Sequence, residues 1–221
     1  QLLSYRLAST TGYTSIASNF PAKVQNATLE LTVNTINIKI DKFQWNSSFN
    51  LTLPKNILKR FPDIESTSYA NRLIIGQPLS IIRTLRFAGT DPSTGLYQFF
   101  SKDGDIIALP SSNDLTELVD ISPKYYGGIE NAITFGEVSL DFHFHFIKQV
   151  GPNFLLNNGT TLQPGRFSSG GSNQPIYVLE RWQRDGDVSS IQKFSTRSDA
   201  STHLSIAKAS SVAFSDASFV R

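Results

Sequence analysis

Residues 137–148 read EVSLDFHFHFIK, and apolar and polar side chains alternate along the stretch. The apolar positions are Val138, Leu140, Phe142, Phe144 and Phe146, and the polar positions between them are Ser139, Asp141, His143 and His145. A period of two predicts a β-strand that places the two sets on opposite faces of a sheet. In a soluble sheet the apolar face covers a core, whereas in an outer-membrane barrel it meets lipid and the polar face lines a wet lumen. Other features of the sequence must separate these two cases.

The same period predicts two long hairpins. Residues 27–53 alternate on both sides of a tight polar connection at Asp41-Lys42, and the phase slips near Asn34, which is compatible with a β-bulge. The stretch quoted above belongs to a second hairpin, over about 128–148. The turns inside these hairpins are only two to four residues long.

The connections between the hairpins are much longer than the turns within them. Long loops are predicted over about 54–126 and about 149–213, with turn signals such as DPSTG (91–95) and KDGD (102–105). Structureless loops of this length are uncommon in compact soluble domains. Short turns at one end and long loops at the other are typical of outer-membrane barrels.

Composition excludes several classes of protein. The chain has 221 residues, 17% of them charged, with a net charge of +2, which is too mild to indicate nucleic-acid binding. Cys is absent, so disulfides, Cys-ligated zinc and a Cys nucleophile are excluded together. No stretch approaches the ~20 apolar residues of a membrane-spanning helix. Met is also absent, even at position 1, so we expect a processed chain or part of a longer one.

The sequence offers little that indicates catalysis or cofactor binding. No G-x-S-x-G motif occurs, and a pair of catalytic acids cannot be chosen among eighteen carboxylates without geometry. His143 and His145 share a predicted strand face with Asp141, but a spacing of roughly 7 Å between alternate residues is wide for one metal ion. We therefore predict no enzyme, no cofactor and no metal site.

A series of motifs in a fixed order resembles the SusC/RagA family of TonB-dependent outer-membrane transporters of Bacteroidetes. The most specific part is PKYYGGIENAITFGEVSLDFHFHF (123–146). The resemblance also includes ASTTGYTSIASNF (8–20), VQNATLELTVNTINI (24–38), DKFQWNSSFNLTLPKN (41–56), IIGQPL (74–79), GTDPSTGLYQF (89–99), KDGD (102–105), ERW (180–182) and DASFVR (216–221). One local departure is Thr28, which stands where the family usually has Gly.

The resemblance implies an all-β fold, namely an arc of a large antiparallel transmembrane β-barrel with short periplasmic turns and long extracellular loops. It implies a place in the bacterial outer membrane and TonB-dependent import of oligosaccharides or peptides. The implied partners are a SusD-like surface lipoprotein, outer-membrane lipid, and the TonB complex acting through a plug domain that this chain lacks. More barrel is expected to follow DASFVR, and the chain is expected neither to insert nor to transport by itself, because strand edges must be paired within lipid.

Two sets of candidate site residues follow from the strand pattern and the resemblance. The candidates for the lumen face are Gln44, Asn46, Ser48, Asn50, Asp141, His143 and His145. The loop aromatics predicted to contact ligand or partner are Tyr69, Tyr97, Phe99, Tyr177 and Trp182. Packing within the loops explains these aromatics about equally well.

A soluble β-sandwich, either a carbohydrate-binding or a capsid-like module, is the alternative fold. It should show more strands at 8–12-residue spacing and fewer long loops. The two folds differ in what the face of Val138 to Phe146 meets: a second packed sheet in the sandwich, or the outside of a curved sheet in the barrel.

Overall fold

The computed structural model describes residues 2–6, 9–19, 21–157, 174–194 and 198–221, which form two units. The first unit comprises Gln1–Ile81, Asp120–Val150 and Ala217–Arg221, and the second comprises Ile82–Val119 and Gly151–Asp216. Among the described residues, no helix is long and apolar enough to cross a membrane.

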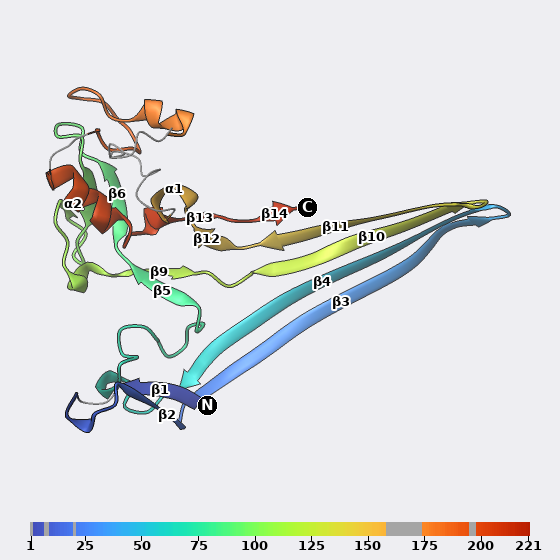
Figure 1. Ribbon diagram of the computed structural model, residues 1–221, viewed down its shortest axis with the longest axis horizontal. Helices are drawn as coiled ribbons and strands as arrows, with labels where there is room; N and C mark the ends of the chain where they lie inside the picture. Colours follow the sequence, from blue (N-terminus) through green and yellow to red (C-terminus); the bar gives the residue numbers. More distant parts are fainter. Residues whose placement is uncertain (1, 7–8, 20, 158–173, 195–197) are drawn as a thin grey trace. The chain divides into compact units, whose positions relative to one another are not determined.

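The first unit is built around an antiparallel sheet in the order β14-β11-β10-β4-β3. Its strands are β3 (Lys23–Ile40), β4 (Phe43–Arg60), β10 (Tyr125–Phe135), β11 (Val138–Lys148) and the short β14 (Phe219–Val220). Figure 1 shows the four long strands side by side, with both tight hairpin turns at the same end. The register agrees, because Phe43 of β4 pairs with Phe135 of β10. The long connections therefore all leave the sheet at its other end.

Backbone conformation explains the two tight turns. Asp41 (φ 23°) and Gly136 (φ 60°) both adopt positive φ, which Gly and Asp tolerate better than most residues. Each turn reverses the chain within two residues, Asp41-Lys42 in the first hairpin and Gly136-Glu137 in the second.

The first hairpin extends beyond the predicted range of 27–53, since it begins at Lys23 and ends at Arg60. Pro54 lies within β4, although Pro cannot donate a ladder hydrogen bond. Strand β10 pairs with β4 only as far as Thr52, so Pro54 lies where β4 has only β3 beside it. One free side of the strand accommodates a residue without an N–H.

The predicted break in alternation is a β-bulge, and it falls at Asn37. Ile36 pairs with Asn46 and Ile38 with Trp45, so Asn37 is the extra residue. The bulge moves Ile38 and Ile40 to the apolar face but leaves Ile36 on the polar face.

The rest of the first unit packs at the open end of the hairpin β3–β4. Its elements are β1 (Leu2–Arg6), β2 (Ser15–Asn19), η1 (Ser9–Thr11) and η2 (Ile64–Ser66). A small core of Leu58, Phe61, Ile64 and Leu73 anchors the segment after β4. Part of the predicted first loop is therefore folded against its own hairpin.

The second unit is formed by both long connections together. Its elements, some shared at the boundary, are β5 (Ile81–Thr84), β6 (Arg86–Thr90), β7 (Tyr97–Phe100), β8 (Ile106–Ile107), η3 (Ser112–Asp114), β9 (Glu117–Asp120), β12 (Val150–Pro152), α1 (Phe154–Asn157), η4 (Ile176–Glu180), α2 (Ser198–Ala207), η5 (Ser211–Ala213) and β13 (Phe214–Asp216). Leu85, Tyr97 and Phe99 from the first connection meet Leu156, Leu204, Ala207 and Ala213 from the second in one core. The two connections fold as partners rather than as independent loops.

Candidate functional site

The register brings the seven predicted lumen candidates together on one face of the sheet. Four rows cross β4, β10 and β11, and each row joins a residue of β4 to one of β11 through β10. The rows are Gln44–Thr134–Ser139, Asn46–Ala132–Asp141, Ser48–Glu130–His143 and Asn50–Gly128–His145. Amides, hydroxyls, carboxylates and imidazoles thus form a continuous polar surface.

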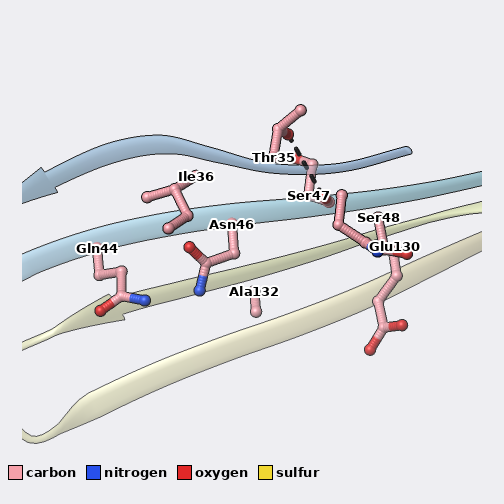
Figure 2. Close-up of a pocket in the computed structure, with 9 residues that line it drawn as sticks. Thr35, Ile36, Gln44, Asn46, Ser47, Ser48, Glu130 and Ala132 are labelled. Carbon is pink, nitrogen blue, oxygen red and sulfur yellow. Dashed lines mark hydrogen bonds between the residues drawn. The ribbon is translucent and has the colours of Figure 1, made fainter. Parts of the chain in front are cut away.

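A groove of about 510 Å³ runs along this polar face where β3, β4 and β10 meet. Figure 2 shows Gln44, Asn46 and Glu130 directed to one side of the ribbon, with Thr35 and Ser47 on the opposite side. Ala132 leaves space between these longer side chains. The groove offers both donors and acceptors, which suits a polar, uncharged or weakly charged solute.

A second hollow of about 220 Å³ lies further along the same face, next to both histidines. Gly128 makes it possible, because a Cβ at this position would lie only 2.8 Å from Cε1 of His143. The rings of His143 and His145 are 6.4 Å apart between centroids, wider than two imidazoles bound to one tetrahedral ion. Within the described ranges, no group of three potential His, Cys, Asp or Glu ligands comes together.

The contribution of β10 to the polar face was not predicted from the sequence. Glu130 and Thr134 line it, and both lie in the middle strand. The alternation in β10 is hidden by Gly127-Gly128 and by Asn131, which lies among apolar residues on the other face. The pattern of β10 alone therefore does not show which of its residues lie on the polar face.

The opposite face is apolar and is not covered by protein within the first unit. Phe142 is 38% exposed and Phe144 is 48% exposed, although both are large rings. Leu29, Leu31 and Val33 of β3 are also exposed. A sandwich would bury these rows under a second sheet, so the exposure argues against that alternative.

Asn131 is part of a hydrogen-bonded cluster on the apolar face. Its side-chain oxygen accepts from Nε1 of Trp45 at 3.0 Å and from Oγ of Ser47 at 2.6 Å. Asn37, in the bulge, donates to Ser47 Oγ at 2.6 Å and accepts from Oγ1 of Thr35 at 2.9 Å. The polar groups satisfy one another, which lowers the cost of placing them in an apolar surface.

The loop aromatics divide into buried and partly exposed residues, and the prediction of ligand contact is wrong for two of them. Tyr97 is 2% exposed and Phe99 is fully buried in the core of the second unit. Burial raises the pKa of Tyr97 to about 12. These rings hold the two long connections together and cannot reach a ligand.

The other three aromatics are half-buried; Tyr69 and Trp182 have hydrogen-bond partners, whereas the buried hydroxyl of Tyr177 has none among the described residues. Tyr69 donates a hydrogen bond through its hydroxyl to the carbonyl of Ser4 at 2.8 Å. Burial raises the pKa of Tyr177. Trp182 donates through Nε1 to the carbonyl of Pro92 at 2.8 Å, and its ring lies directly against Gly95. The ERW and DPSTG motifs therefore meet, because the tryptophan of one packs on the turn of the other.

Comparison with known proteins places these features in context. No protein-family model matches the chain. The TonB-dependent receptor P26 of Formosa agariphila is 25% identical over 215 residues, a match that covers 87% of this chain and 21% of the relative. Two solved structures match all of this chain and 24% of their own: the RagAB peptide transporter (TM-score 0.73, 17% identity) and the RagAB peptide importer in its 'closed-closed' state (TM-score 0.71, 16% identity). The chain thus spans about a quarter or less of the length of the proteins it matches.

The sheet and its two contrasting faces define the class of protein: the chain is an arc of a large antiparallel transmembrane β-barrel. Within that class, the ordered motifs resemble the SusC/RagA family, and the chain is similar over most of its length to a curated TonB-dependent receptor. The fold class predicted from the sequence is confirmed, and the curated relative and the solved structures support the predicted resemblance.

Proposed function

We propose that the chain forms part of the wall and the surface loops of a receptor that imports nutrients across the bacterial outer membrane. The observation that carries the proposal is the contrast between the two faces of one sheet. One face presents uncovered aromatic and aliphatic rows, and the other presents a grooved polar surface. Lipid outside and water inside is the arrangement that this contrast fits.

The polar face is the proposed lumen surface, with Gln44, Asn46, Ser48, Asn50, Asp141, His143 and His145 facing the solute. Both hollows of the sheet, beside Ala132 and beside Gly128, open on this face. Hydrogen-bonding side chains of mixed type suit oligosaccharides or peptides, and the RagAB structures are those of a peptide importer. Chemistry on the solute is not part of this function.

In this proposal, partner proteins supply the energy for import and capture the solute. The TonB complex would act through the plug of the complete receptor, and a SusD-like surface lipoprotein would cap its mouth. The long connections leave the sheet at the end opposite the tight turns, so we assign that end to the cell exterior. Trp182 and Tyr177 belong to the second unit and remain candidates for contact with solute or lipoprotein.

Adjacent positions of β11 provide a direct test of which face meets lipid. Because this chain has no Cys, Phe142→Cys and His143→Cys can be introduced singly into a cysteine-free form of the full-length receptor. A spin label at position 142 should collide with oxygen dissolved in lipid, and a label at 143 with a water-soluble nickel chelate. If both labels avoid both reagents, position 142 is buried in protein and the proposal fails.

Import itself is tested in cells. A strain that lacks the receptor should lose uptake of one class of polymer when oligosaccharides and peptides are supplied separately. Uptake should return with the intact gene and should require the TonB complex. Unchanged uptake of every polymer class in the deletion strain would contradict a role in nutrient import.

A further inference from the structure

The charged side chains of the apolar face lie at one end of the sheet. Alternation and register place Lys55, Lys148 and the pair Lys23–Arg60 on this face, and Lys59 is the extra residue in the bulge beside that pair. In the described strands β3, β4, β10 and β11, no carboxylate lies on this face. All of these basic residues are at the end from which the long connections leave. We call them the basic collar.

The collar begins where a membrane-sized apolar band ends. On β4 the band runs from Phe43 to Leu53, and Lys55 is the next residue on the same face. Ten residue steps of ~3.3 Å, tilted by ~45°, give a height of ~23 Å, close to the ~25 Å apolar band of outer-membrane barrels. On β11 the row ends at Phe146 and Lys148 follows it. The collar therefore lies at the level of lipid headgroups, not of acyl chains.

The cations of the first hairpin are available to a partner. Lys23, Lys55, Lys59 and Arg60 are exposed, and their side chains make no ion pair or hydrogen bond with the described part of the chain. At the other end of the hairpins both signs of charge occur together, since the turns carry Asp41, Lys42 and Glu137. An excess of positive charge on the apolar face is thus confined to one boundary of the apolar band.

We propose that the basic collar binds the phosphate groups of an anionic glycolipid headgroup in the outer leaflet of the outer membrane. The inference rests on the proposed function, which makes the apolar rows lipid-facing and the collar end extracellular. Lys and Arg form short, charge-assisted hydrogen bonds to phosphate, and Arg60 can do so with two donors at once. The collar is continuous with the lipid-facing rows and lies on the face that points away from the lumen. Lipid is therefore its occupant rather than the lipoprotein that caps the mouth.

The test compares two variants of the full-length receptor in which lysines are replaced by uncharged glutamine. One carries Lys23→Gln, Lys55→Gln and Lys59→Gln, and the control carries Lys39→Gln and Lys42→Gln near the opposite end of the first hairpin. Each is placed in phosphatidylcholine nanodiscs that contain a small fraction of bisphosphorylated lipid A, and the bound lipid A is counted by native mass spectrometry. Neutralising these three lysines should lower lipid A retention about a hundredfold, since each basic residue near a membrane surface contributes about fivefold. The control should retain lipid A like the wild type.

A dephosphorylated lipid and a salt series test whether the phosphate groups are what the collar binds. Lipid A without phosphates should bind wild type and collar variant equally, and raising the salt concentration should reduce the difference between them. Unchanged retention of phosphorylated lipid A in the collar variant overturns the inference. The inference is also overturned if the collar variant retains lipid A but no longer binds the surface lipoprotein, because the collar then binds a protein. The spin label at position 142 separates this failure from failure of the proposed function, since it reports whether the variant faces lipid at all.

Discussion

The contact between Gly95 and Trp182 allows a sharp test of how the two long connections hold each other. Gly95 has φ +71° and a Cβ there would overlap the ring of Trp182, so Gly95→Ala must displace the indole. Gly104 provides the matched control, because it has φ +97° and nothing lies within 4 Å of its Cβ position. Both substitutions carry the same kind of backbone penalty, and only the first adds a clash.

The size of the difference can be worked from the contacts. The positive φ costs each variant about 1 kcal/mol. Displacing Trp182 adds about 1 kcal/mol for its hydrogen bond to Pro92 and about 1 kcal/mol or more for overpacking. Gly95→Ala should therefore lower the opening free energy of this region by about 2 kcal/mol more than Gly104→Ala, which is about a thirtyfold difference in exchange rate.

Hydrogen exchange with mass spectrometry on the full-length receptor measures this opening. Peptides that cover 89–99 and 180–193 should exchange faster in Gly95→Ala, while peptides of β10 and β11 keep the wild-type rate. Adding Trp182→Ala to Gly95→Ala should cancel the clash and leave only the backbone penalty, so the double variant should exchange only about fivefold faster than Trp182→Ala by itself. Equal rates in Gly95→Ala and Gly104→Ala would refute the reasoning.

Two further predictions concern the sheet and its border. Gly127→Ala would push a Cβ into the backbone carbonyl oxygen of Asn50 and should destabilise the folded barrel by ~2 kcal/mol or more. Gly128→Ala would place a Cβ 2.8 Å from the side chain of His143 and 3.1 Å from the carbonyl oxygen of Phe144, so it should cost less, about 1 kcal/mol. Denaturant unfolding followed by gel mobility compares the two variants, and equal losses would contradict the assignment. Burial raises the pKa of Asp120, but hydrogen bonds from one ammonium, two hydroxyls and an amide outweigh it and hold that pKa below its ordinary value. Its stabilising effect is therefore complete at neutral pH, declines as pH falls below the ordinary carboxyl pKa, and is fully lost only well below pH 3. Asp120→Asn should speed local exchange most at pH 7 and by less, but still measurably, at pH 3.

The candidate site was only partly visible in the sequence. Period-two alternation in β4 and β11 was enough to select seven residues that share one face, because side-chain direction in a strand follows from position. Asn131 could not be assigned, since its partners Trp45 and Ser47 lie more than eighty residues away. The burial of Tyr97 and Phe99 was invisible for the same reason, because their neighbours come from the other long connection.

By itself, the sequence determined the two hairpins, the two chemically opposite faces and the resemblance to a transporter family, because alternation and ordered motifs are local properties of the chain. Only the tertiary structure decided that β10 lies between β4 and β11, that the bulge falls at Asn37, and that the long connections share one core. It also showed that the basic residues gather at one boundary of the apolar band. Those features depend on register and on contacts between distant segments, which no local pattern records.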